Sequence, residues 1–294
     1  MEGMEREAGK RVELGFGTIF LNLRGFEFRG HRGSVVQKGD DQIDVAPAAG
    51  FFRVAADRFI KNLGEVYFKS LTSCGAGNER GKNEEASAVE EGSSGQGNDG
   101  GLEEKEVLQD VEGEERKEVE KPYSIRFTGD RIKTEGGIIS TSCTLTARRK
   151  GFPGVRFTVV QVRISGENRE VIARTTGVIT PHRLMAVIDA LGDMMRQSLI
   201  YPLGSAVLVA DSEKVLFQSG TLQTELEKWQ EAELKYLLTG KFFIPDVIRL
   251  NFRAGRVRIE EVAQNEVVLT FGGVTHGLSF GDMFVLWSVL GKGH

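Results

Sequence analysis

The sequence is poor in cysteine and has no long apolar run. Its two cysteines, Cys74 and Cys143, belong to no Cys-x-x-Cys pair, so they suggest neither a disulfide framework nor a zinc site. No apolar stretch approaches the ~18–20 residues that span a bilayer, and residues 1–7 carry acidic side chains where a signal peptide needs basic ones. We therefore expect a soluble, intracellular protein of a reducing compartment. The cytoplasm or nucleoid is favoured, an organelle stays open, and no membrane partner is expected.

Catalytic patterns are also scarce. The sequence has no Gly-x-Ser-x-Gly elbow, and Gly15-Phe16-Gly17 lacks the further glycine of a phosphate-binding loop. No two histidines have metal-ligand spacing; the four are His31, His182, His276 and His294. We predict no catalytic residue, metal or cofactor, and a protein that is not an enzyme. A catalytic site would require side chains from separate parts of the chain to converge.

Charge is distributed unevenly along the chain. The formal net charge is −4, but residues 79–121 contain 15 acidic and 6 basic side chains, a local net of −9. The rest of the chain therefore carries 32 basic and 27 acidic residues, a net of +5. A mildly basic remainder is compatible with a polyanionic partner.

The acidic stretch at 74–121 also has almost no aromatic residues and is rich in Gly, Ser, Asn and Glu. Such a composition cannot bury enough apolar surface to offset chain entropy, which predicts a disordered linker. Two interpretations stay open for it. It is either a flexible, solvated connection or an acidic mimic of nucleic acid that folds back on a basic face.

Strand and helix patterns divide the remaining sequence into units. Residues 1–11 are polar and are expected to be frayed. Alternating strands followed by a helical pattern at 54–70 make a first unit, 12–73. Dense strand signals and a helix make a second unit, 122–199. A hairpin at 205–218, an amphipathic helix at 221–238 that buries Trp229, further strands and a closing helix make a third, 203–294.

The closing helix has an echo earlier in the chain. Residues 277–291 and 178–192 both place an aliphatic residue and a hydroxyl before a polar turn, an apolar stripe and Leu-Gly. Ser279 and Asp282 have the spacing of a capping box, and Thr180 with Pro181 suits an N-cap followed by the first helical position. This repetition predicts an α+β protein of antiparallel ββββα-like units.

Basic and aromatic residues on the strands are the strongest functional signal. Cations neutralise phosphates and rings stack on bases, a combination that suits a sheet surface binding single-stranded nucleic acid. The alternative is that arginine is an ordinary solvated residue on the polar face of an antiparallel sheet. The candidate binding residues are Arg24, Phe26, Phe28, Arg29, Arg148, Arg149, Lys150, Phe152, Arg156, Arg163, Arg249, Arg253, Arg256 and Arg258.

The order of four strands and a helix resembles Whirly-type proteins and the kinetoplast guide-RNA-binding proteins similar to them. It is also similar to Pur-repeat proteins and to single-strand-binding transcriptional coactivators, in which a Gly, an aliphatic residue, a hydroxyl and an amphipathic helix follow a curved sheet, as in Gly277-Leu278-Ser279 and the helix to Leu290. The resemblance covers 123–294, with a weaker unit at 12–71. It implies that sheet faces carry the ligand.

Together these patterns predict a non-catalytic protein that binds single-stranded DNA or RNA on its sheet faces. The alternative is a protein–protein adaptor or scaffold that assembles through its sheets and the 221–238 helix. The expected partners are accordingly a nucleic-acid strand and either a second copy of the chain or another protein.

Overall fold

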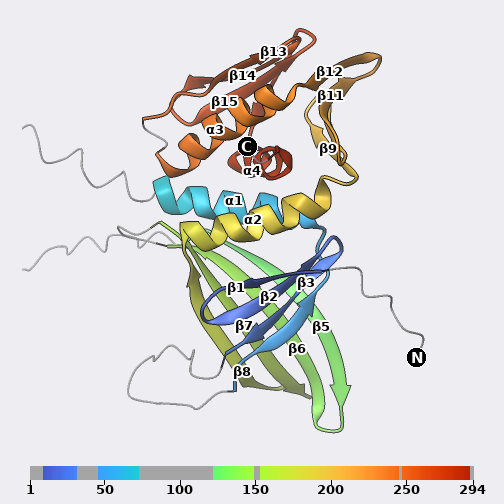
Figure 1. Ribbon diagram of the computed structural model, residues 1–294. Coiled ribbons are helices and arrows are strands. Elements are labelled where there is room, and N and C mark those ends of the chain that lie inside the picture. Colours follow the sequence, from blue (N-terminus) through green and yellow to red (C-terminus); the bar gives the residue numbers. More distant parts are fainter. Residues whose placement is uncertain (1–8, 32–45, 73–121, 149–152, 245–246, 292–294) are drawn as a thin grey trace, which may run out of the picture. The chain divides into compact units, whose positions relative to one another are not determined.

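The computed structural model describes residues 9–31, 46–72, 122–148, 153–244 and 247–291. Within these ranges the chain forms the same unit four times, four antiparallel strands in consecutive order followed by one helix (Figure 1). The expected α+β class with repeated ββββα units is therefore confirmed. The acidic stretch at 74–121, predicted to be a disordered linker, lies outside the described residues.

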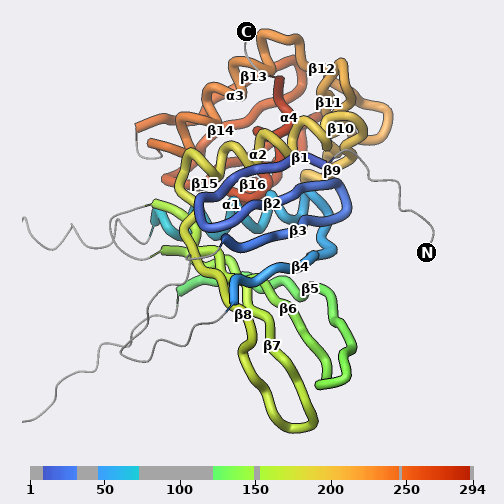
Figure 2. Tube along the Cα trace, turned by 60° about the horizontal axis from the view of Figure 1, so that its bottom comes forward, coloured from blue at the N-terminus to red at the C-terminus, as the bar shows by residue number. Residues whose placement is uncertain are grey.

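The first two units contain sheets A and B. Sheet A and its helix consist of β1 (Lys10–Glu13), β2 (Gly17–Asn22), β3 (Gly25–Gly30), β4 (Ala49–Phe52) and α1 (Ala56–Thr72). Sheet B and its helix consist of β5 (Ser124–Thr134), β6 (Gly137–Ala147), β7 (Val155–Ser165), β8 (Asn168–Ile179) and α2 (Pro181–Met195). The strands of sheet B are the longest in the described chain, and Figures 1 and 2 both show its hairpins extending away from the helices.

The last two units contain sheets C and D. Sheet C and its helix consist of β9 (Leu199–Leu203), β10 (Ala206–Ala210), β11 (Val215–Ser219), β12 (Leu222–Leu226) and α3 (Lys228–Phe243). Sheet D and its helix consist of β13 (Asn251–Ala254), β14 (Val257–Ala263), β15 (Glu266–Phe271), β16 (Val274–Leu278) and α4 (Phe280–Val289). No helix in the described ranges is long and apolar enough to cross a membrane.

The segment 203–294 was expected to be one unit, but it contains two: most of the unit of sheet C, which begins at Leu199, and the unit of sheet D. The helix expected over 221–238 begins only at Lys228, because residues 222–226 pair with β11 as a fourth strand. Glu227 and Gln230 form a capping box that starts the helix at this point. Trp229, expected on the inner face, is 59% exposed. The leucine spacing that favoured a longer helix also fits strand alternation, and pairing with β11 decides between them.

The first two units exchange their helices. α1, which follows sheet A, packs against β5, β6 and β7, whereas α2, which follows sheet B, packs mainly against β1 and β2 and less extensively against β8 of its own sheet. Between the sheets, the ring centroids of Phe28 and Phe157 lie 5.1 Å apart and those of Phe26 and Phe127 lie 6.2 Å apart. Neither sheet therefore covers its apolar face with its own helix alone.

The segment 277–291 that suggested the repeat forms the most buried helix of the described chain. α4 packs against α1, α2 and α3. It is capped as expected, because Ser279 Oγ accepts the amide of Asp282 while the Asp282 carboxylate accepts the amide of Ser279. At the α2 crossing, a Cβ added to Gly192 would lie 1.9 Å from the Ser288 carbonyl oxygen. The close approach of these two helices therefore requires glycine at position 192.

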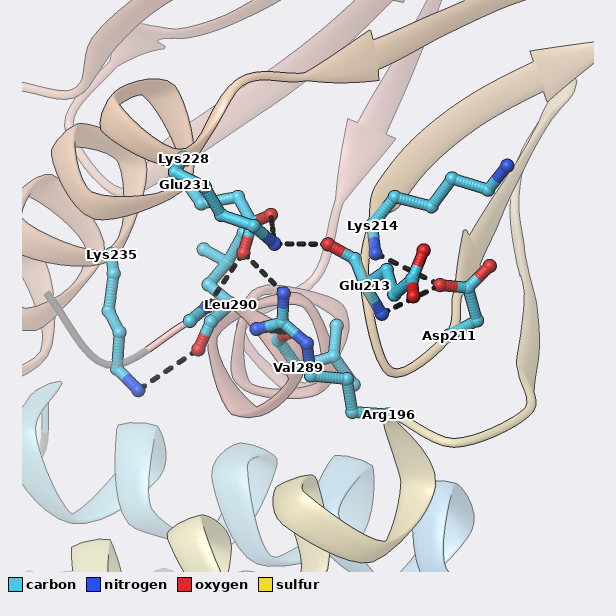
Figure 3. A network of polar contacts seen from close by, with 10 residues as sticks. Arg196, Asp211, Glu213, Lys214, Lys228, Glu231, Lys235, Val289 and Leu290 are labelled. Atoms are coloured by element: carbon cyan, nitrogen blue, oxygen red, sulfur yellow. Dashed lines mark hydrogen bonds and ion pairs between the residues drawn. The ribbon is translucent and has the colours of Figure 1, made fainter.

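A buried carboxylate joins three of the helices (Figure 3). Glu231 of α3 is 1% exposed and accepts hydrogen bonds from Arg196, which follows α2, at 2.7 Å and from Lys228 at 2.9 Å. Arg196 also donates to the Val289 carbonyl at the end of α4 (3.1 Å), and Lys235 donates to the carbonyl of Leu290 (3.2 Å). The network satisfies carbonyls at the C-terminus of α4 that the helix itself leaves unpaired.

Asp282 provides a test of the contact between α4 and its neighbours. Burial raises its pKa, but hydrogen bonds from Lys61, Tyr201 and Ser279 outweigh burial and hold the pKa below its usual range. A lowered pKa contributes stability that is complete above about pH 5 and is lost as pH falls through the folded-state value. We expect Asp282→Asn to lower the free energy of unfolding by about 2 kcal/mol at pH 7.

The pH dependence of that loss is the specific part of the prediction. Urea denaturation of the wild type and of Asp282→Asn should give stabilities that converge as pH falls from 5 toward 3, because the wild type loses the contribution that the variant never had. A difference that stays constant over this range would contradict the assignment.

Candidate nucleic-acid interface

Sheet B has one face packed on the core and one face directed outward. Directly paired residues of antiparallel strands lie on the same face, and successive residues alternate. The row Phe127, Cys143, Val159 and Thr175 is buried throughout, and the amide of Ala48 donates to Thr175 at 2.9 Å. The neighbouring rows therefore point away from sheet A and α1.

Five outward rows can be followed along the sheet. They are Ser124–Thr146–Arg156–Val178, Arg126–Thr144–Thr158–Thr176, Thr128–Ser142–Val160–Arg174, Arg131–Ser140–Val162–Val171 and Lys133–Ile138–Ile164–Arg169. We call these side chains the cationic face. Its basic residues are Arg126, Arg131, Lys133, Arg156, Arg169 and Arg174, all exposed, and the rows contain no aspartate or glutamate.

The cations of this face are not neutralised by neighbours. None of the six takes part in an ion pair within the described part of the chain. Arg126 donates a hydrogen bond to Ser142 Oγ at 3.1 Å, so its guanidinium leans over β6. Thr176 and Thr158 are hydrogen-bonded to each other at 3.3 Å. The cationic face therefore combines free positive charge with rows of hydroxyl groups.

The other three sheets serve as an internal comparison, since they share the same topology. On sheet A the outward residues Arg11 and Arg29 are paired with Glu13 and Glu27. The outward strand rows of sheet C have Glu225 and no cation.

On sheet D the outward residues Arg253 and Arg258 are balanced by Glu260 and Glu266. The ββββα unit alone therefore does not impose positive charge on the outer face. The cationic face is a property of sheet B.

The first group of candidate residues divides between surface and core. Arg24 is exposed in the turn after β2, and Arg29 is exposed on sheet A, where its guanidinium lies 5.1 Å from the ring of Phe20 and pairs with Glu27 at 2.7 Å. Phe26 and Phe28 are 1% and 0% exposed, so the expectation that these rings stack on bases is wrong. The strand directs them into the core.

The second group lies around the β6–β7 hairpin. Arg149, Lys150 and Phe152 fall outside the described residues, and Arg148 is half-buried just after β6. Arg156 belongs to the cationic face. Arg163 lies on the opposite face of β7, paired in register with Ile139 and Glu170 and 3.5 Å from the Glu170 carboxylate. These two arginines therefore do not form one surface.

The third group lies at sheet D. Arg253 and Arg258 are exposed and directly paired across β13 and β14, Arg256 is exposed in the turn between them, and Arg249 is exposed before β13 begins. Arg258 is ion-paired with Glu260. The structure thus brings Arg253 and Arg258 together but places them on a different sheet from Arg156.

Sequence reasoning missed most of the cationic face: Arg126, Arg131, Lys133, Arg169 and Arg174. Gly129-Asp130 looked like a turn between two short strands, yet β5 is continuous and the pairing register shifts between Thr128 and Arg131. This bulge returns Arg131 and Lys133 to the face of Arg126. Simple alternation would have placed them on the opposite side.

The described residues contain no group of three His, Cys, Asp or Glu side chains that could hold a metal ion. The exposed cations of the cationic face create a local positive potential on sheet B. Comparisons with family models, with curated proteins and with solved structures found no match for this chain.

Proposed function

We propose that this chain binds single-stranded nucleic acid on the cationic face of sheet B, without catalysing a reaction. The observation that carries the proposal is the set of six exposed cations with no carboxylate in the same rows. Phosphates provide the matching repeated negative charge, and release of their counterions supplies most of the binding free energy. Hydroxyl side chains add donors for phosphate and sugar oxygens.

The dimensions of the face favour a single strand over a duplex. Four strands ~4.8 Å apart make a surface about 14 Å wide, and strands of 11 or 12 residues make it about 36 Å long. A flexible strand can follow such a surface, whereas duplex readout requires an element that enters a groove. Bases can contact the side chains of Val160 and Val162 and can stack on the arginine guanidinium groups, whose planes take the place of aromatic rings.

Fluorescence anisotropy of labelled 20-mers with the full chain tests the proposal. If a strand neutralises all six cations, log Kd should change with log salt with a slope of about 4, a weakening of roughly 250-fold between about 50 and 200 mM. We expect single-stranded DNA and RNA to bind at micromolar concentration or tighter at the lower salt, and a matching duplex to bind more weakly.

Competition separates nucleic acid from other polyanions. Unlabelled oligothymidylate should displace the probe at far lower concentration than a polyglutamate peptide of equal charge, because the peptide lacks bases and sugars for the aliphatic and hydroxyl side chains. No binding at about 50 mM salt, or equal displacement by polyglutamate, would overturn the proposal.

A protein–protein adaptor is the second candidate, and one observation favours it. α3 and the residues after it expose large apolar side chains at helical spacing: Trp229, Tyr236, Phe243, Ile244 and Val247. Tyr236 is 73% exposed, and patches of this kind on soluble proteins often mark contacts with other proteins. This function requires an assembly that survives nuclease treatment and depends on Tyr236 rather than on the cationic face.

A further inference from the structure

The cations of sheet B are arranged in a way that specifies the path of the ligand. Along the strands, each of the five outward rows contains at least one cation: Arg156, Arg126, Arg174, Arg131, and the pair Lys133 and Arg169. Successive rows are two residues apart, about 6.7 Å. Positive charge therefore repeats along the strand direction over the whole length of the sheet.

Across the strands the arrangement is different. β5 has three of the cations, β8 has two, β7 has one, and β6 has none. The outward side chains of β6 are instead the hydroxyls of Ser140, Ser142, Thr144 and Thr146, followed by Ile138. Because the Arg126 guanidinium donates a hydrogen bond to Ser142 Oγ, at least one cation of β5 reaches over the outward side chains of β6.

We infer that a single strand of nucleic acid lies along β6, parallel to the protein strands, with one phosphate at each outward row. The half-buried hydroxyls of Ser140, Thr144 and Thr146 donate to phosphate and sugar oxygens from below, and Arg126, which covers the buried Ser142, contacts the strand directly. The other cations, on β5, β7 and β8, flank the strand on its two sides. Five rows hold five phosphates, which are the internucleotide linkages of a hexanucleotide. This inference rests on the proposed function and adds the orientation and length of the site.

A path across the sheet is less favourable. A strand running from β5 to β8 would meet its cations at the edges of the sheet and pass over β6 without any, and each single row would offer one or two positive charges. Counterion release grows with the number of phosphates neutralised, so the path along β6 engages more of the available charge.

Two matched double variants of threonine test the path. The double variant Thr144→Val with Thr146→Val removes two outward hydroxyls from β6. The double variant Thr158→Val with Thr176→Val removes two outward hydroxyls from β7 and β8, in the row that also contains Thr144. Valine keeps the shape and the strand preference of threonine, so both variants should fold. We expect the β6 variant to bind oligothymidylate about tenfold more weakly than the wild type, and the β7–β8 variant, whose hydroxyls lie beside the path, to bind only about twofold more weakly.

A length series gives the second measurement. The affinity of the full chain for oligothymidylates should rise steeply up to about six nucleotides and then increase only with the number of overlapping registers. An oligouridylate series reports whether RNA follows the same length dependence.

Equal losses in the two variants, no loss in either, or a length dependence that ends at two or three nucleotides would overturn the path while leaving binding itself in place. Absence of binding by the wild type to every oligonucleotide would overturn the proposed function and the path together.

Discussion

Replacing Arg126, Arg156 and Arg174 together by glutamine is expected to weaken binding of a single-stranded 20-mer about 100-fold at about 50 mM salt. The three residues occupy three successive rows of the cationic face on three different strands. Each contact of an exposed guanidinium with a phosphate contributes about 1 kcal/mol, and loss of three neutralised phosphates should reduce the salt slope from about 4 to about 2.

A matched control tests whether the loss is local. Arg11, Arg29 and Arg253 are exposed arginines of sheets A and D, and their replacement by glutamine changes the net charge of the chain by the same amount. We expect this variant to keep the salt slope of the wild type. If both triple variants bind equally weakly, the attraction comes from overall charge and the cationic face is not the site.

Lys241→Met is expected to lower the free energy of unfolding by about 3–5 kcal/mol, measured by chemical denaturation. The side chain of Lys241 is 1% exposed and that of Glu261 is 9% exposed, and the Lys241 ammonium lies 2.6 Å from a Glu261 carboxylate oxygen. Burial raises the pKa of Glu261, but the hydrogen bond from Lys241 and the amide of Asn265 hold the pKa below its usual range. Removing the ammonium leaves a charge buried between α3 and β14.

The double variant Lys241→Met with Glu261→Gln provides the control for this second prediction. Glutamine keeps an oxygen that accepts the Asn265 amide but carries no charge, so most of the lost stability should return. The ion pair would not account for the stability of this site if Lys241→Met lowered the free energy of unfolding by less than about 1 kcal/mol, or if the double variant were no more stable than the single one.

The repeated architecture could be predicted because its signals are local. The capping box of Ser279 and Asp282 and the proline at the start of α2 fix where helices begin, and both are confirmed. The predicted helix start at residue 221 was wrong, and the helix begins at Lys228, because Leu222 and Leu226 satisfy both helical and strand spacing. Hairpin pairing with β11, the strand that directly precedes these residues, decides between the two.

The candidate site was predicted less well, for two physical reasons. Alternation shows that Phe26 and Phe28 share a face, but the presence of an apolar partner layer decides that this face is buried. The bulge in β5 reverses which face of the sheet each residue after Asp130 points to. Composition alone cannot distinguish such a bulge from a turn. Arg156 was identified because β7 has no such interruption before it.

The exchange of helices between the first two units has a consequence for synthesis on the ribosome. α1 needs β5–β7 as its partner and sheet A needs α2, so residues 10–72 cannot complete their core until residues up to 195 have emerged. At ~5–20 residues per second the delay is roughly 6–25 s, during which sheet A lacks the part of its cover that α2 provides. The sequence separation of these contacts also predicts slow folding for the pair of units. Nascent chains that end before α2 are therefore the species most exposed to chaperones and proteases.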